Sequence, residues 1–447
     1  MKISEYALLL LIAALTGLSS CSKEDDLLNG QNISSEPVIM VSTTGYESDS
    51  PETRATDNED EFKTTLAEND QIGIYAVKNG RVISKNIPYK YNSSKAWEKA
   101  GTEAVAAVPG SDVSYFAYYP YRKEMDNKDI KDVNDIITHF DVAADQSTHD
   151  LYTKNDLMTA TSTLSPDQKT LSFTLQHSLA LIVLDLKGQR TPYKGGYAVY
   201  GEVSKVAKKQ IGNVTEPYTD AKGCYRALVK PGSVTPDISY VAGGKTVTYN
   251  KAITAAAGKY SKKLIYAGNT TTEQEIKYGD YFYADGNISS TYTNNSSNPC
   301  IGIVLTTSEV SVLEPAPHNH GLVVALKDAP ERFTYPYFGL PEKYLKILPL
   351  VPSSCKNWFL PSINQLKFMI WGNTTTQGTD GKKNLETRMD GVEGSEKFNQ
   401  KGLTNIFWSS TTNDDWETQW KIDLADNGAI SVWGFTGQGN ARAIFAF

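Results

Sequence analysis

Alternation between apolar and polar positions dominates the chain from about residue 60 to 272 and predicts β-strands. The clearest runs are 70–77, 113–121 and 172–186, where the apolar residues recur with the period of two that gives a strand one buried face. Gly243-Gly244 separates two further runs, and a Gly pair supplies the positive φ of a two-residue hairpin turn. Another strand is predicted at 260–267. Short strands between polar turns favour β-sandwiches.

The pattern changes in residues 273–447, which hold six of the seven Trp. Ser362 and Gln365 form a capping box that predicts the start of a helix. The residues that follow give this helix an apolar stripe: Ile363, Leu366, Met369 and Ile370. Asn427-Gly428, between alternating runs, predicts a β-hairpin. This part of the chain is therefore expected to be α+β.

Residues 1–20 have the pattern of a signal peptide. The apolar run 8–18 is too short for a membrane-spanning helix, which needs about 20 residues. Leu18-Ser19-Ser20-Cys21 resembles the lipobox of bacterial lipoproteins, which implies a lipid on the Cys21 thiol. The acidic run 22–26 resembles a signal for export to the outer face of the outer membrane. The alternative is an ordinary secretory signal followed by a chance Cys.

Residues 21–54 are predicted to be an acidic tether with one strand-like piece at 37–43. The rest of this region is rich in polar residues, as linkers are. Arg54 lies in this polar stretch, where a protease of trypsin-like specificity could reach it.

An ordered set of short motifs resembles the fimbrillin-like family over about residues 37–272. The motifs are Thr53-Arg54-Ala55, 70–76 (DQIGIYA), 116–120 (FAYYP), 156–158 (DLM), Phe173-x-Leu175-x-His177 and 257–260 (AGKY). The resemblance implies a mainly β protein with two transthyretin-like β-sandwich domains, here 55–190 and 191–272. The resemblance also matches His177 to a position of the family. Because His177 lies on the apolar face of a predicted strand, it is expected to be a buried core histidine.

Members of this family are pilus subunits that are exported as lipoproteins and cleaved by an Arg-specific protease. The resemblance therefore implies cleavage between Arg54 and Ala55, which would remove the strand at 38–43. The exposed groove would accept a donor strand from another pilin subunit. If Arg54 is only a surface residue, the uncleaved chain would stay lipid-bound as a pilus anchor or minor subunit.

The C-terminal part resembles a C-type-lectin-like module. The motifs that carry this resemblance are 358–362 (WFLPS), 407–411 (FWSST) and Arg442-Ala443-Ile444. It implies an α+β lectin-like domain at 273–447 that binds a host or bacterial surface glycan or a protein. The candidate ligand-binding residues are Asp414, Asp415, Trp416 and Trp433. Core packing is the alternative for each Trp, and the calcium-type motifs of sugar-binding lectins are absent from the sequence.

Charge and cysteine content restrict the remaining chemistry. The net charge of −7 disfavours nucleic acid as a partner. Beyond Cys21, a Cys300–Cys355 disulfide is one prediction, because both residues belong to the third unit and the envelope is oxidising. Cys224 would then be a free thiol. His318 and His320 lack a third ligand for a metal in the sequence pattern, so no metal or cofactor is expected.

The combined prediction is a surface-exposed fimbrial subunit, a tip adhesin, held at the cell outer membrane by lipid before cleavage. A tip position is expected because a folded module follows the second sandwich. A stand-alone surface glycan-binding lipoprotein and an uncleaved pilus anchor are the alternatives. The sequence shows no GxSxG, HExxH or phosphate-binding motif, so no enzyme is expected. A glycosidase is a further alternative, because its two carboxylates can be far apart in sequence.

Overall fold

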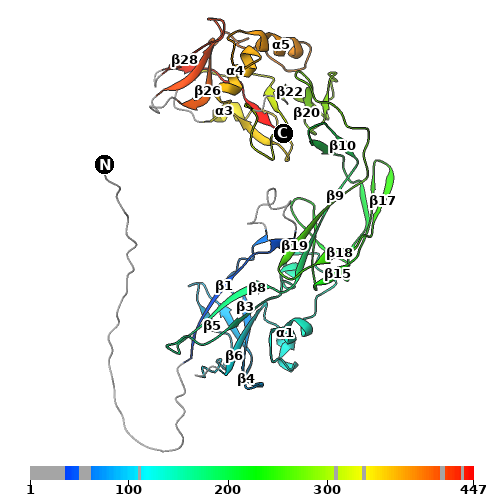
Figure 1. Cartoon of the computed structure of the whole chain (residues 1–447), viewed down its shortest axis with the longest axis vertical. Coiled ribbons are helices and arrows are strands. Elements are labelled where there is room, and N and C mark those ends of the chain that lie inside the picture. The colour runs from blue at the N-terminus through cyan, green and yellow to red at the C-terminus, as the bar shows by residue number, and fades with distance from the viewer. Residues whose placement is uncertain are drawn as a thin grey trace, which may run out of the picture.

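Strands account for most of the regular structure of the chain, which is mainly β. The computed structural model describes residues 36–49, 62–108, 112–306, 311–334, 339–412, 418–433 and 437–447. The first β unit lies at one end, a second β unit lies in the middle, and the α+β unit with the C-terminus lies at the other end (Figure 1). Among the described helices, none is long and apolar enough to cross a membrane.

The first unit is a seven-stranded sheet in the order β1-β8-β7-β6-β3-β4-β5. Its strands are β1 (Val38–Thr43), β3 (Gln71–Lys78), β4 (Arg81–Tyr91), β5 (Trp97–Lys99), β6 (Val113–Tyr119), β7 (Met158–Ser162) and β8 (Thr170–His177). The strand predicted at 70–77 is confirmed as β3, but it is buried on both faces, with Ile72 and Ile74 in one core and Tyr75 in another. The sheet curls until β1 contacts β5, so its first face encloses a core by itself.

The second face of this sheet is covered by short helices and by the next β unit. The helices are η2 (Lys123–Asn127), α1 (Val133–His139) and α2 (His149–Thr153). Asp132 and Asp135 form a capping box that starts α1, and Ile136 is the residue that α1 buries. Leu181 and Leu228 of the second unit enter the same core, which therefore joins the two β units.

The second unit packs a five-stranded sheet, in the order β13-β14-β9-β19-β2, against a three-stranded sheet, β12-β16-β17. The strands are β2 (Glu47–Ser48), β9 (Ala180–Lys187), β12 (Lys205–Ile211), β13 (Tyr218–Thr219), β14 (Tyr225–Val229), β16 (Pro236–Ala242), β17 (Lys245–Tyr249) and β19 (Lys259–Tyr266), with β15 (Gly232–Val234) paired to β18 (Ile253–Ala255). The hairpin predicted around Gly243-Gly244 is confirmed, with positive φ at both glycines.

The single strand predicted at 172–186 is wrong, because this run forms β8 and β9 in two different sheets. β8 has one buried face, as its alternation predicts. Residues 180–184 of β9 are buried on both faces, with Ile182 in one core and Leu181 in the other. The first two units therefore meet between β8 and β9, whereas the sequence placed their boundary at 190/191.

The C-terminal unit is built on a six-stranded sheet in the order β21-β20-β22-β23-β30-β25. Its elements are β20 (Tyr281–Tyr283), β21 (Ile288–Ser289), β22 (Cys300–Thr306), β23 (Leu322–Ala325), β25 (Lys356–Phe359), β30 (Ile444–Ala446), α3 (Glu342–Leu345), α4 (Ile363–Trp371) and α5 (Asp380–Met389). β24 (Phe333–Thr334) pairs with β29 (Gln438–Gly439), and β26 (Ile406–Thr412), β27 (Gln419–Asp423) and β28 (Ala429–Trp433) form a separate sheet. The predicted helix is confirmed as α4, including its capping box at Ser362 and Gln365.

A hairpin from the middle of the chain completes the core of the C-terminal unit. β10 (Arg190–Pro192) and β11 (Ala198–Tyr200) flank Tyr193 and Tyr197, which are buried among its aromatic residues. The Tyr197 hydroxyl donates to the carbonyl of Gly286 at 2.9 Å, and the Tyr193 hydroxyl accepts from the Ile288 amide at 2.9 Å. The unit predicted at 273–447 therefore borrows core residues from 190–200.

We expect Tyr197→Ala to destabilise the C-terminal unit by about 3–5 kcal/mol, because the change removes a large buried ring. Urea unfolding followed by Trp fluorescence measures this, since six of the seven Trp lie in 273–447. Tyr200→Ala is the matched control, because Tyr200 belongs to the same hairpin but is only half-buried. Equal unfolding midpoints for the two variants would contradict the conclusion that Tyr197 belongs to the core of the C-terminal unit.

Candidate functional site

Residues 36–49, here called the leader segment, complete the edges of two sheets. β1 runs parallel to β8, with Val38 opposite Thr170 and Thr43 opposite Leu175. β2 runs parallel to β19, with Glu47 opposite Lys259. Both β1 and β2 occupy end positions in their sheets. One short segment therefore supplies an edge strand of the first unit and an edge strand of the second.

Backbone hydrogen bonds hold the leader segment along its whole length. In the first unit, the amide of Val38 donates to the Lys169 carbonyl at 2.7 Å, and that of Thr44 donates to the Leu175 carbonyl at 3.0 Å. In the second unit, two leader amides donate to β19 and the residue before it: Glu47 to the Gly258 carbonyl at 2.9 Å and Asp49 to the Tyr260 carbonyl at 3.1 Å. Lys259 also forms an ion pair with Glu47.

The side chains of β1 divide between the core and solvent. Ile39 is 5% exposed and packs in the core that the curled sheet encloses. Its neighbours Val38 and Met40 are 60% and 57% exposed. The strand is thus held by backbone pairing and by one row of side chains, while its exposed outer row includes the apolar Val38 and Met40.

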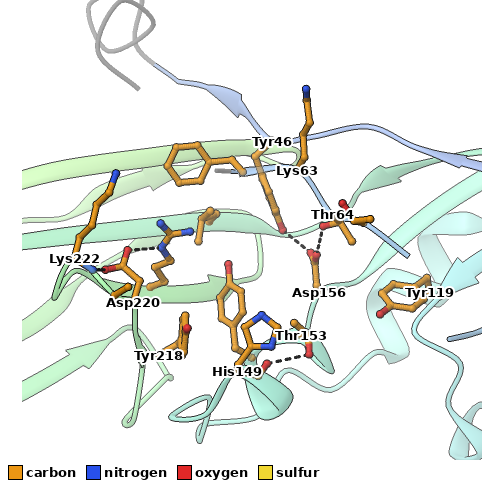
Figure 2. A pocket seen from close by; sticks show the side chains of 16 residues that line it. Tyr46, Lys63, Thr64, Tyr119, His149, Thr153, Asp156, Tyr218, Asp220 and Lys222 are labelled. Atoms are coloured by element: carbon orange, nitrogen blue, oxygen red, sulfur yellow. Dashed lines mark hydrogen bonds and ion pairs between the residues drawn. The ribbon is translucent and has the colours of Figure 1, made fainter. Parts of the chain in front are cut away.

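Tyr46 anchors the leader segment where it passes from one sheet to the other. Its ring stacks on the imidazole of His177, with centroids 3.7 Å apart and an interplanar angle of 22°. Its hydroxyl donates to Asp156 Oδ1 at 2.9 Å (Figure 2). Burial, followed by the nearby Asp156 carboxylate, raises the pKa of Tyr46 well above its usual value. The phenol therefore stays protonated and remains a donor.

Asp156 is held by groups other than Tyr46 as well. His177 Nδ1 lies 2.8 Å from Asp156 Oδ1, and the Thr64 hydroxyl donates to Asp156 Oδ2 at 2.7 Å. The His177 side chain is fully buried, which confirms the prediction of a core histidine. Sequence reasoning missed Tyr46 and Asp156 as site residues, although Asp156 and His177 both lie in the motifs quoted above. The signal for Tyr46 was a lone aromatic residue in a polar tether.

A pocket of about 460 Å³ opens beside Tyr46, between the two β units. Tyr46, Thr64 and Asp156 line one side, and Asp220 and Lys222 line the other (Figure 2). The second side is held by an ion pair in which Arg226 Nε lies 2.8 Å from Asp220 Oδ2.

Phe62 begins the chain on the far side of the undescribed stretch 50–61. Its ring stacks on Tyr260 with centroids 4.2 Å apart, and the Arg226 guanidinium lies 5.1 Å from its centroid. The Phe62 carbonyl accepts from the Tyr46 amide at 3.0 Å. The residues just after this stretch are therefore part of the wall against which the leader segment packs.

Several predicted site residues lie outside the described residues: Cys21, Arg54, Ala55, Asp414, Asp415 and Trp416. Trp433 is described and is 39% exposed at the end of β28. Its ring lies 6.2 Å from that of Trp408, and Lys421 Nζ lies 4.7 Å from its centroid. Trp433 is thus a surface aromatic that packs on one side against its own unit.

The predicted Cys300–Cys355 disulfide is wrong, because both residues are free thiols. Cys300 begins β22 and Cys355 precedes β25, and the sheet places β23 and β30 between those strands. Three strand spacings separate them by about 14 Å, beyond the reach of a disulfide. The two residues also pack on different cores. Burial raises the pKa of the thiol to about 11 for Cys300 and about 12 for Cys355.

The histidines of 318–320 do not gather metal ligands. His320 Nδ1 lies 2.9 Å from the carbonyl of Gly195 in the inserted hairpin, so this ring joins two parts of the chain. Within the described ranges, no group of three or more His, Cys, Asp or Glu is placed to hold a metal ion.

Comparisons with known proteins found a family model, a relative and a solved structure that are similar to this chain. The model of the family described as "Fimbrillin-like" matches residues 53–311. A protein of Bacteroides ovatus, named "Putative fimbrium tip subunit Fim1C", is 32% identical over 329 residues, which are 68% of this chain and 59% of that protein. The crystal structure of a fimbrial protein from Bacteroides ovatus is 22% identical, with a TM-score of 0.39; the match covers 92% of this chain and 99% of that one.

We expect a chain that begins at Ser22 to yield three thiols when it is denatured without a reductant: Cys224, Cys300 and Cys355. Alkylation of the native chain should be slow, because burial raises the pKa of all three thiols. Mass spectrometry after alkylation counts the thiols. Cys300→Ser should lower the count by one. A count of one thiol in the unsubstituted chain would show that Cys300 and Cys355 form a disulfide and would contradict this prediction.

Proposed function

The chain belongs to the fimbrillin-like family, and on that premise we propose that it is a fimbrial subunit whose leader segment is exchanged for a strand of a neighbouring subunit. The observation that carries this proposal is the double edge position of residues 36–49. All of these residues precede Arg54, so one cut after Arg54 would separate both edge strands from the rest of the chain.

Release of the leader segment would create a site for an extended peptide. The edge of β8 would lose the hydrogen bonds made by Val38 and Thr44, and the core would lose Ile39. An edge strand with unpaired backbone groups beside an apolar groove is a template for strand addition. A strand from another pilin subunit would restore both the hydrogen bonds and the buried side chain.

The proposed route to the surface rests on the N-terminal sequence. Residues 1–20 would direct export, and lipid on Cys21 would hold the chain at the cell outer membrane until cleavage. Ala55 would then be the first residue of the assembled subunit. Family membership favours a structural and adhesive role over catalysis.

A position at the fimbrial tip is supported by the C-terminal unit. β30 lies between β23 and β25 inside the six-stranded sheet, and Phe447 is buried. β30 is therefore fixed in its own unit and is not available as a donor strand. The similar protein of Bacteroides ovatus carries the name of a tip subunit. The proposed subunit would accept a strand and present its C-terminal unit outward.

The C-terminal unit is proposed to be a C-type-lectin-like module that binds a surface glycan or protein. The WFLPS motif leads into the capping box of α4, and Trp408-Ser409-Ser410 lies in β26. Trp433 is an exposed aromatic on this unit, and exposed aromatics are common anchors of binding sites. Asp414, Asp415 and Trp416 complete the candidate set from sequence.

We expect an Arg-specific protease to cut the chain from Ser22 onward after Arg54 and to leave Ala55 as the N-terminus. The cut chain should then bind an added pilin strand, because both sheet edges become available. N-terminal sequencing and size-exclusion chromatography measure the two steps. Arg54→Gln is the control and should stay monomeric. An intact N-terminus in the unsubstituted chain would argue for an uncleaved anchor or a stand-alone lipoprotein.

Antibody against residues 273–447 should label filament ends on cells, because the proposed tip subunit accepts a strand and presents this unit outward. Immunogold electron microscopy measures the distribution of label. Antibody against a major shaft subunit is the control and should label along the filament. Label spread over the cell surface without filaments would favour the glycan-binding lipoprotein.

A further inference from the structure

Three of the side chains that surround Tyr46 lie outside the leader segment. His177 belongs to β8, Asp156 precedes β7, and Thr64 follows the undescribed stretch 50–61. All three residues lie after Arg54 in the sequence, so cleavage there would leave them in the chain. We call these three side chains the aromatic socket.

The socket holds itself together through Asp156. Its Oδ1 lies 2.8 Å from His177 Nδ1, and its Oδ2 accepts from the Thr64 hydroxyl at 2.7 Å. These two contacts fix the carboxylate and the imidazole plane without Tyr46. What remains is a flat ring face with one carboxylate oxygen at its rim.

A flat face with an acceptor at its rim suits a particular class of side chain. A planar ring can stack on the imidazole, and an O–H or N–H at the ring edge can satisfy Asp156 Oδ1. An aliphatic side chain would cover the imidazole but would leave Asp156 Oδ1 with one donor fewer, which is unfavourable in a buried site. Tyr46 meets both requirements in the uncut chain.

We propose that the aromatic socket is a specificity site for the incoming strand. It selects a strand that carries, at the Tyr46 position, an aromatic residue with a hydrogen-bond donor at the edge of its ring, tyrosine above all. The inference rests on the proposed strand exchange and names the chemistry of the partner strand. The register of the leader segment sets the spacing. The inward positions Ile39 and Val41 are followed by four residues and then by Tyr46. The partner strand should therefore read apolar-x-apolar-x4-Tyr.

The alternation of β1 sharpens this expectation, because it separates positions that matter from positions that do not. Ile39 is buried and would have to be replaced by an apolar residue of the partner. Val38 and Met40 point outward and place no demand on it. The Tyr46 position differs from both, since it asks for a ring and a hydrogen-bond donor together.

The test uses the chain from Ser22 onward, cut after Arg54, and fluorescent peptides with the sequence of residues 36–49. Fluorescence anisotropy measures the affinity of the unsubstituted peptide and of its Tyr46→Phe, Tyr46→Ala and Met40→Ala forms. We expect Tyr46→Phe to weaken binding about tenfold, because it loses one hydrogen bond to a charged group. Tyr46→Ala should weaken it about a hundredfold or more, and Met40→Ala less than about threefold.

A protein variant separates the hydrogen bond from general packing. In Asp156→Asn, the acceptor loses its charge, so the preference for the unsubstituted peptide over Tyr46→Phe should fall to less than about threefold. Equal affinity of the cut chain for the unsubstituted and Tyr46→Ala peptides would overturn the socket while leaving strand exchange intact. Failure of every peptide to bind the cut chain would overturn strand exchange and the socket together.

Discussion

The structure depends on a shared requirement of its two N-terminal sheets, namely that their edge strands be paired. β8 and β19 each have one side that no other described strand covers, and the leader segment pairs with both. An unpaired edge beside an apolar core invites association with other chains. One segment of 14 residues supplies the edge strand next to β8 and the edge strand next to β19. The two sheets are therefore completed by the same piece of chain. The position of Tyr46, the pocket beside it and the proposed exchange all follow from this arrangement.

Asp156 shows how a buried charge can organise such a closure. A carboxylate taken out of water needs donors for its oxygens, and here they come from three separate segments: the leader segment, the chain at Thr64, and β8 at His177. Only the donor from the leader segment would leave on cleavage. Thr64 and His177 would still contact Asp156 after cleavage, whereas the contact from Tyr46 could be replaced by a residue of a partner strand. The first two contacts are structural, and the third would determine which partner strand binds.

Local signals in the sequence predicted the elements that local physics determines. The period of two placed β3 and β6, the Gly pair placed the β16–β17 hairpin, and the capping box placed the start of α4. Contacts between distant segments were not readable in this way. The division of 172–186 depends on which sheet each half joins, and the distance between Cys300 and Cys355 depends on strand order. The hydrogen-bond and stacking partners of the Tyr46 side chain, Asp156 and His177, lie more than 100 positions away.

The hairpin that carries Tyr193 and Tyr197 also determines how the ends of the molecule are connected. The chain passes between the second β unit and the C-terminal unit three times, through β10, through β11 and after β19 (Figure 1). β9 and β19 are parallel neighbours that both lead toward this joint, where Arg190 and Asn269 form a further bridge. A pull on the C-terminal unit would thus be divided among three covalent strands. A twist would meet resistance from buried rings, so the joint would transmit torque as well as tension.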